Sequence, residues 1–269
     1  MPKALSQEQA DFFARENYLA PVPAIAPERA AAVLAELDAF AARTGDDPVE
    51  VFKDKPHLLL KSLSDVARDP HVLDAIEDVL GPDILLIEAG FFWKLGGDRQ
   101  YAAWHQDATY LRMEPPVCVT AWIALTDSRI DNGCLRVIPG TQHSELPLHM
   151  IDDPDNYLRM NREISVPLAA DTAVNLELEP GEMSLHGRLV HGSRPNLSDR
   201  RRVGYAIMYI PPHVTLNAGT MSSATLVRGE DRYGHFEPEP EPRYDWDPVT
   251  VAWYERQAGQ GMTDTYRWD

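Results

Sequence analysis

Residues 183–210 have the sequence MSLHGRLVHGSRPNLSDRRRVGYAIMYI. Within this stretch, two apolar runs at 183–190 and 203–210 lie on either side of a segment rich in Gly, Ser, Pro, Asn and Asp. Short runs rich in β-branched and aromatic residues that are bounded by such turn residues predict strands. We therefore expect two strands here, joined by a polar connection.

The same pattern recurs through the centre of the chain and predicts a mainly β protein. Helical patterns precede it: Ser6 and Gln9 form a capping-box pattern that opens a helix to about Glu16. Many short strands after a helical start, without strand–helix alternation, favour a barrel or sandwich packed against helices. Further strands are expected at 84–94, 117–125, 134–138 and 173–178, and further helices at 27–43, 70–80 and 249–257.

Two polar segments are expected to be a loop and an irregular tail. Residues 144–163 are polar and turn-rich, and their position between core strands suggests a lid or a substrate loop. Residues 234–247 are acidic and Pro-rich, which is a composition that disfavours regular structure.

Size and charge exclude several classes of protein. The 269 residues suffice for one barrel-like domain with helical additions. The 25 Lys and Arg against 42 Asp and Glu give a formal net charge of −17, which argues against nucleic acid and against an anionic membrane as partners. Cys118 and Cys134 fall in expected core strands and should be buried thiols. Because no long apolar stretch suggests a signal peptide or a membrane span, we expect a soluble, cytoplasmic protein.

Two motifs supply the ligands of a mononuclear iron site. His105 and Asp107 are two residues apart, so on one strand they would face the same way while Gln106 points away. His191 would then arrive from another strand. Two His and one carboxylate on one face of a metal are the ligand set of non-haem Fe(II) oxygenases, although the same set suits zinc. Arg202, eleven residues beyond His191, adds the cation that an anionic cosubstrate needs.

At these residues the chain resembles the phytanoyl-CoA dioxygenase family of Fe(II)- and 2-oxoglutarate-dependent oxygenases. The resemblance implies a double-stranded β-helix core (a jelly roll, cupin-like) with flanking N-terminal α-helices. It covers roughly the central half of the chain and is carried by Phe92-Trp93-Lys94, Trp104-His105-Gln106-Asp107, Thr120-Ala121-Trp122-Ile123-Ala124-Leu125, Asn132-Gly133-Cys134-Leu135, Ile138-Pro139-Gly140-Thr141 and residues 181–209. We expect a single domain over residues 1–269, with a mostly helical part at 1–82, the jelly-roll core at 83–215 and a C-terminal extension at 216–269.

The resemblance also implies roles for individual residues. His105, Asp107 and His191 would be the catalytic residues that bind Fe(II), and Arg202 would pair with the distal carboxylate of 2-oxoglutarate, with O2 as the second cosubstrate. Lys94 and Trp122 match positions that line the cosubstrate pocket in relatives, although a strand-end lysine and a core tryptophan are the ordinary alternatives.

Neighbouring residues leave alternatives open. Arg200 or Arg201 could hold the carboxylate in place of Arg202, and Asn196 could shape the loop through hydrogen bonds to the backbone. His186 shares the expected strand of His191 at an odd spacing, so it should face the opposite way and serve packing or support of the ligands.

We expect a dioxygenase that hydroxylates an aliphatic C–H bond of a small metabolite and releases succinate and CO2. Asp107 disfavours halogenation, because related halogenases have a small residue there and bind chloride instead, whereas desaturation stays open. The alternative from another class is a metal-binding jelly roll without redox catalysis. The sequence leaves the substrate and the oligomeric state open.

Overall fold

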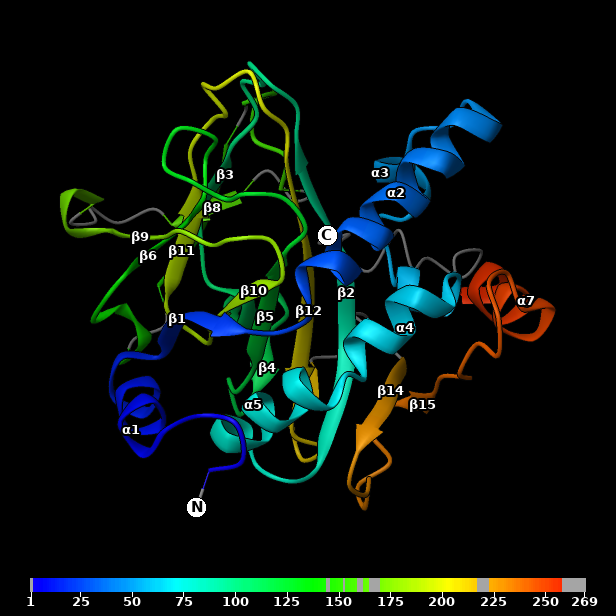
Figure 1. The fold of residues 1–269 in the computed structure, drawn as a ribbon. Coiled ribbons are helices and arrows are strands. Elements are labelled where there is room, and N and C mark those ends of the chain that lie inside the picture. Colours follow the sequence, from blue (N-terminus) through cyan, green and yellow to red (C-terminus); the bar gives the residue numbers. More distant parts are fainter. Residues whose placement is uncertain are drawn as a thin grey trace.

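The computed structural model describes residues 2–143, 146–151, 153–158, 162–164, 170–216 and 223–257. Two β-sheets face each other, and helices pack on the far side of the larger sheet (Figure 1). The expected fold class, a jelly-roll core with flanking N-terminal helices, is confirmed.

The helices are α1 (Gln7–Glu16), α2 (Pro27–Thr44), α3 (Pro48–Val51), α4 (Lys61–Ala67), α5 (Pro70–Leu80), α6 (Asp107–Tyr110) and α7 (Pro248–Gln257), with 3-10 turns η1 (Pro56–Leu58), η2 (Thr141–His143) and η3 (Ala170–Thr172). The strands are β1 (Tyr18–Pro23), β2 (Ile84–Lys94), β3 (Ala102–His105), β4 (Met113–Glu114), β5 (Val119–Ala124), β6 (Leu135–Ile138), β7 (Leu148–Met150), β8 (Arg162–Ile164), β9 (Val174–Leu176), β10 (Glu182–His186), β11 (Val190–Ser193), β12 (Arg202–Ile210), β13 (Thr215–Leu216), β14 (Ser223–Arg228) and β15 (Glu237–Pro238).

The larger sheet has the strand order β1-β10-β5-β12-β2-β14-β15, and the smaller sheet has the order β3-β11-β6-β9. All neighbours pair antiparallel except β14 and β15. Strand β12 lies between β5 and β2, so residues of these three strands form continuous rows across the sheet. Strands from all three of the expected parts share this sheet, and we therefore propose that the chain is one domain.

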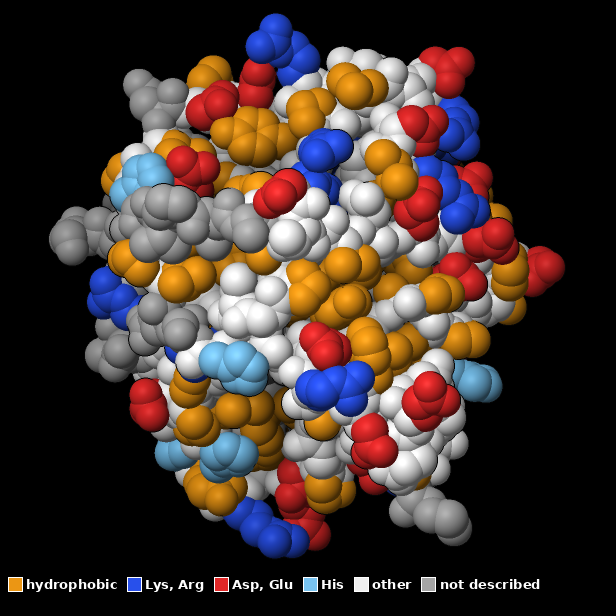
Figure 2. Space-filling model, turned by 90° about the vertical axis from the view of Figure 1, so that its left-hand side faces the viewer, with side chains coloured by type: hydrophobic (Ala, Val, Ile, Leu, Met, Phe, Trp, Pro, Cys, Tyr) orange, Lys and Arg blue, Asp and Glu red, His pale blue; other side chains and the backbone are white. Residues whose placement is uncertain are grey.

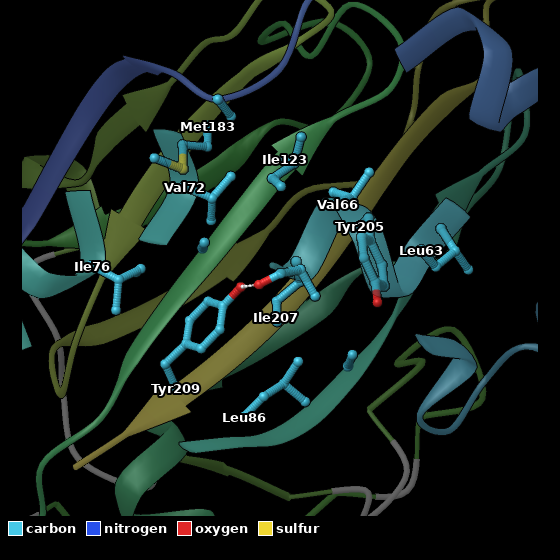
Figure 3. Packing of buried hydrophobic residues seen from close by; sticks show 14 of the residues in the cluster. Leu63, Val66, Val72, Ile76, Leu86, Ile123, Met183, Tyr205, Ile207 and Tyr209 are labelled. Carbon is cyan, nitrogen blue, oxygen red and sulfur yellow. Dashed lines mark hydrogen bonds between the residues drawn. The ribbon is translucent and has the colours of Figure 1, made fainter. Parts of the chain in front are cut away.

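The three expected N-terminal helices, α1, α2 and α5, begin where the sequence indicates, whereas α3 and α4 were not expected. Ser6 and Gln9 form the capping box of α1, and Asp69 accepts a hydrogen bond from the His71 N–H at the start of α5. Helices α4 and α5 bury their apolar faces against the larger sheet, where the Tyr209 hydroxyl donates to the carbonyl oxygen of Ala67 over 2.8 Å. The side chains drawn in this layer include Leu63, Val66, Val72, Ile76, Leu86, Ile123, Ile207 and Tyr209 (Figure 3).

Two expectations about strands and tails are wrong. Residues 183–190 do not form one strand, because β10 ends at His186 and β11 begins in the other sheet. Asn17, the left-handed C-cap of α1, accepts from the Gly187 N–H with its carbonyl and from the Arg188 N–H with its side chain, which takes these peptide groups out of the sheet. The acidic tail, expected to be irregular, contributes β15 and the buried Glu239.

Residues 144–163 contain more regular structure than expected. Strands β7 and β8 pair antiparallel within or next to this segment, whose residues 144, 145, 152 and 159–161 lie outside the described residues. Its role as a lid or substrate loop stays a prediction.

The expectation for the two cysteines agrees with the structure. Cys118 and Cys134 are buried free thiols. Within the described ranges, no helix has both the length and the apolar character needed to cross a membrane. Lys and Arg side chains lie among Asp and Glu side chains across the described part of the face shown in Figure 2.

Candidate metal and cosubstrate site

Three side chains expected to bind metal meet between the two sheets. His105 ends β3 and His191 lies opposite it on β11, so the antiparallel pairing brings their rings to 4.1 Å between centroids. The Asp107 Oδ1 atom lies 3.5 Å from His105 Nε2 and 3.4 Å from His191 Nε2. Ligand atoms of the three residues all lie within 4.8 Å of one another. Two donors at about 2.1 Å from one ion and at right angles lie about 3 Å apart, so one ion fits among these atoms.

Asp107 reaches this position by a different route from the expected one. We expected His105 and Asp107 on one strand face, but β3 stops at His105 and Asp107 begins the helical turn α6. The side chain of Gln106 is buried and donates to the Thr141 carbonyl oxygen over 3.0 Å. This hydrogen bond links the residue before α6 to the 3-10 turn η2. The expectation of a shared strand face is therefore wrong, although the two side chains do converge.

Both imidazoles present the Nε2 atom to the centre. His105 Nδ1 lies 2.8 Å from the carbonyl oxygen of Ala103, and His191 Nδ1 lies 3.2 Å from that of Leu189. A carbonyl oxygen only accepts, so each Nδ1 carries the proton and donates. Each Nε2 then carries a lone pair that can bind a metal, an arrangement in which the backbone fixes the tautomer.

Burial and mutual charge set the protonation of the three groups. Burial, with a further contribution from His191, lowers the pKa of His105 to about 4. Burial by itself raises the pKa of Asp107, but the neighbouring His191 and His105 outweigh it and lower that pKa. Burial opposes a proton on His191, yet Asp107 raises its pKa. The carboxylate is therefore ionised and His105 neutral at neutral pH, as metal ligands must be.

His186 lies beside this centre, contrary to the expectation that it faces away from His191. Its ring centroid is 4.4 Å from that of His191, and its Nε2 is 3.7 Å from Asp107 Oδ2. The odd spacing does not turn the two side chains apart, because His186 and His191 belong to different strands in facing sheets. Burial lowers the pKa of His186 to about 3, so this imidazole is neutral.

A pocket of about 540 Å³ opens beside the three residues. One wall is the inner face of β5, β12 and β2, and the loop residues Tyr157 and Leu158 add to the lining. The lining includes the candidate ligands His105, Asp107 and His191 together with Thr120, Trp122, Phe92, Ser193 and Arg202. The pocket falls in the size range of small-molecule sites.

Of the three consecutive arginines, Arg202 lines this pocket. Its side chain is 1% exposed, and its Nε has no hydrogen-bond partner among the described residues. Arg200 pairs with Asp131 at 2.9 Å and Arg201 with Asp38 at 2.7 Å, and both pairs are on the surface. An anion in the pocket would satisfy this buried donor.

Lys94 and Trp122 lie on either side of Arg202. Lys94 is directly opposite Arg202 in the β2–β12 pairing and is buried, and its Nζ donates to Ser193 Oγ over 2.8 Å and to the Arg194 carbonyl oxygen. Burial, with the nearby charge of Arg202, lowers the pKa of Lys94 to about 6. Trp122 is among the described residues that line the pocket, and Lys94 is not.

The sequence reading gave no role to several residues of this site. Ser193 accepts from Lys94, and its Oγ lies 3.3 Å from the Tyr157 hydroxyl. Ser193 is two residues beyond His191, so the period of a strand could have placed it on the same face. Tyr157 comes from an irregular loop and no sequence signal marks it.

The expectation for Asn196 is confirmed, since its side-chain amide donates to the carbonyl oxygens of Leu95 and Arg200.

Residues that precede η1 also line the pocket. Lys53 and Asp54 line it, and the Lys55 N–H donates to the Ala89 carbonyl oxygen over 2.9 Å, which lays this segment along β2. A Cβ at Gly90 would lie 2.8 Å from the Lys53 carbonyl oxygen, so glycine permits the close approach. Lys55 forms a buried ion pair with Glu239, and the C-terminal tail thereby fixes this wall.

A sequence model of the family described as "Phytanoyl-CoA dioxygenase (PhyH)" matches residues 14–204. The "Phytanoyl-CoA dioxygenase domain-containing protein 1 homolog" of Dictyostelium discoideum is 34% identical over 124 residues, which are 44% of this chain and 42% of that protein. "Ectoine dioxygenase" of Nocardia farcinica is 26% identical over 225 residues, which are 71% of this chain and 73% of that protein. The chain matches less than half the length of the Dictyostelium, Arabidopsis and rice relatives.

Solved structures show the same fold. The structure entitled "non-heme monooxygenase; ThoJ apo" has a TM-score of 0.82 and 30% identity, and the match covers 96% of this chain and 98% of that one. "CytC3 with Fe(II) and alpha-ketoglutarate" has a TM-score of 0.65 and 24% identity, with 91% of this chain and 96% of that one covered. At this lower identity the likeness concerns the fold.

Proposed function

Because this chain belongs to the phytanoyl-CoA dioxygenase family, we propose that it is an Fe(II)- and 2-oxoglutarate-dependent dioxygenase that hydroxylates an aliphatic C–H bond of a small metabolite. The observation that carries the proposal is the convergence of the His105, Asp107 and His191 ligand atoms beside the buried Arg202 in one pocket.

The donor set fits a divalent iron ion. Two imidazoles and one carboxylate leave positions open for exogenous ligands, which is the arrangement of non-haem Fe(II) oxygenases. We propose His105 Nε2, His191 Nε2 and Asp107 as the ligands, because the Nδ1 atoms of both histidines are engaged by backbone carbonyls. When bound, Fe(II) with 2-oxoglutarate and O2 supplies the oxidising chemistry, in which the cosubstrate is converted to succinate and CO2.

Arg202 is proposed to hold the distal carboxylate of 2-oxoglutarate. A guanidinium fork can bind a carboxylate through two hydrogen bonds, and the Nε of Arg202 is without a partner among the described residues. Trp122 lies against the guanidinium, 5.2 Å from the ring centroid to Cζ, and limits its movement. Lys94 holds Ser193 at the edge of the same pocket, so its proposed role is indirect.

Apolar residues of the pocket restrict water around the reacting groups. Phe92 and Trp122 line the pocket, and Phe92 packs on the Tyr157 ring with centroids 5.7 Å apart. The pocket volume of about 540 Å³ suits a small metabolite together with the cosubstrate. We propose hydroxylation over halogenation because Asp107 occupies the position where related halogenases bind chloride.

Succinate release tests this function against a zinc hydrolase or a non-redox jelly roll. Metal-free protein reloaded with Fe(II) should convert 2-oxoglutarate to succinate in air, faster when a substrate is added, whereas protein reloaded with Zn(II) should not. If the Fe(II)-loaded protein releases no more succinate than its His105→Ala variant, the proposed function is wrong. The compounds that stimulate succinate release would identify the substrate class.

A further inference from the structure

The two oxygen atoms of Asp107 have different surroundings. Oδ1 faces the Nε2 atoms of His105 and His191, whereas Oδ2 accepts a hydrogen bond of 2.9 Å from the Thr120 hydroxyl. The Nε2 atom of His186 lies 3.7 Å from Oδ2, which is too long for a direct hydrogen bond but close enough to fill the space beside it. One oxygen is therefore directed to the candidate metal centre and the other to the protein.

Thr120 and His186 are held rigidly in these positions. They are direct partners in the antiparallel pairing of β5 and β10, and they are 5% and 2% exposed. The His186 ring also packs against His191. Because both side chains come from paired strands of the larger sheet, their spacing relative to α6, which carries Asp107, is fixed by the fold.

We propose that Thr120 and His186 are positioning residues that keep Asp107 as a one-oxygen ligand through Oδ1. A carboxylate can bind a metal with one or both oxygens, and a second oxygen would fill a position needed by the cosubstrate or by O2. The Thr120 hydroxyl engages Oδ2, and the His186 ring fills the space beside Oδ2 and opposes the rotation that would bring Oδ2 toward the metal together with Oδ1. This inference rests on the proposed metal site.

Co(II) titration of the metal-free protein without cosubstrate tests the inference, since Co(II) absorption reports both affinity and coordination. Loss of a group that orients a ligand commonly lowers metal affinity 10- to 100-fold. Thr120→Val removes the hydroxyl at nearly constant shape and should weaken Co(II) binding about 10- to 100-fold and alter the visible spectrum. Thr120→Ser, which keeps a hydroxyl, should restore affinity and spectrum.

Ser184→Ala is the matched control. Ser184 lies two residues before His186 on β10, is buried, and its hydroxyl has no hydrogen-bond partner in the described part of the chain. Its Co(II) affinity and spectrum should equal those of the wild type. A loss in Ser184→Ala as large as in Thr120→Val would mean that any change in these strands disturbs the site, and would overturn the proposal.

His186→Leu tests the second proposed positioning residue. If Thr120→Val does not fold, His186→Leu becomes the deciding test of the proposal. This variant should also weaken Co(II) binding and change the spectrum. Wild-type affinity and spectrum in a folded Thr120→Val, or in His186→Leu when it is the deciding variant, would overturn the inference while leaving the metal site intact. Failure of the wild type to bind Co(II) would instead overturn the proposed function together with this inference.

Discussion

The guanidinium carbon of Arg202 lies 5.2 Å from the centroid of the Trp122 indole ring. The contact is possible because residue 204, which follows on the same face of β12, is a glycine: a Cβ there would lie 2.0 Å from the indole. Lys94 is paired with Arg202 on the next strand. The guanidinium is thus confined between an aromatic face and a neighbouring strand, where it can hold an anion without reordering.

Arg202→Ala should raise the KM for 2-oxoglutarate while metal binding persists. Truncating one partner of a buried charged hydrogen bond costs about 2–5 kcal/mol, so the KM should rise at least ~30-fold. Arg201→Ala is the matched control, because Arg201 pairs with Asp38 on the surface and should leave the KM nearly unchanged. Steady-state succinate formation measures both. An effect confined to Arg201→Ala would show that the assignment of the arginine is wrong by one residue.

Gly204→Ala should disturb the contact between the Trp122 indole and the Arg202 guanidinium. The new methyl group overlaps Trp122, so the ring must shift and carry Arg202 out of position. Overpacking of this kind costs about 1–3 kcal/mol of stability, and we expect a raised KM for 2-oxoglutarate in addition. Thermal unfolding and succinate kinetics measure the two effects. An unchanged KM in the destabilised protein would argue against the role of Trp122.

Tyr157→Phe should weaken cosubstrate binding by a smaller factor. The Tyr157 hydroxyl lies 3.5 Å from an Arg202 nitrogen and 3.3 Å from Ser193 Oγ, and both distances are long for hydrogen bonds. Removing it should cost about 0.5–1.5 kcal/mol, which is a KM increase of roughly 2- to 13-fold with little change in kcat. A kcat that falls while the KM stays constant would place Tyr157 in a different role.

Glu239→Gln should change the pH dependence of stability. Burial opposes ionisation of Glu239, but Lys55 and His57 outweigh it and lower its pKa from 4.5 to about 2. Between these values the unfolded chain binds the proton and the folded chain does not, so the stabilisation by Glu239 is present above about pH 4.5 and is lost as the pH falls toward 2. The variant should be less stable by about 3–5 kcal/mol at pH 7, because Lys55 is left buried without its carboxylate, and the difference should narrow on acidification.

Urea unfolding at a series of pH values measures this difference. Glu237→Gln is the control, since Glu237 pairs with Arg256 on the surface and should change stability by less than about 1 kcal/mol. A difference between wild type and Glu239→Gln that is constant from pH 7 to pH 2 would contradict the account.

The sequence predicted the elements that local chemistry determines. The capping residue Ser6 and the apolar spacing of 27–43 and 70–80 located three helices, and the apolar run from Ile84 placed β2 with its observed bounds. His105, Asp107 and His191 were expected to converge, and the structure brings them together. These features are local or depend on a single strand pairing.

The failures concern relationships that depend on tertiary contacts. The strand period could not place Asp107 or His186, because a helical turn and a change of sheet interrupt the alternation. Glu239 is in a tail whose composition resembles a disordered segment, yet it pairs with Lys55 more than 180 residues away in sequence.

Two further contacts also depend on tertiary structure. Tyr157 reaches Arg202 from a loop without any sequence pattern. Thr120 begins the motif Thr120-Ala121-Trp122-Ile123-Ala124-Leu125, but its contact with Asp107 depends on the position of α6.

The first measurement to make on the proposed iron site is anaerobic visible absorption of the protein with Fe(II), before and after addition of 2-oxoglutarate. We expect a weak charge-transfer band to appear with 2-oxoglutarate, because the cosubstrate would then chelate an iron ion held by His105, Asp107 and His191. The band should be absent in His105→Ala, and in Arg202→Ala it should appear only at higher 2-oxoglutarate concentrations. A wild-type protein that binds Fe(II) but shows no band, or a His105→Ala variant that retains it, would contradict the account.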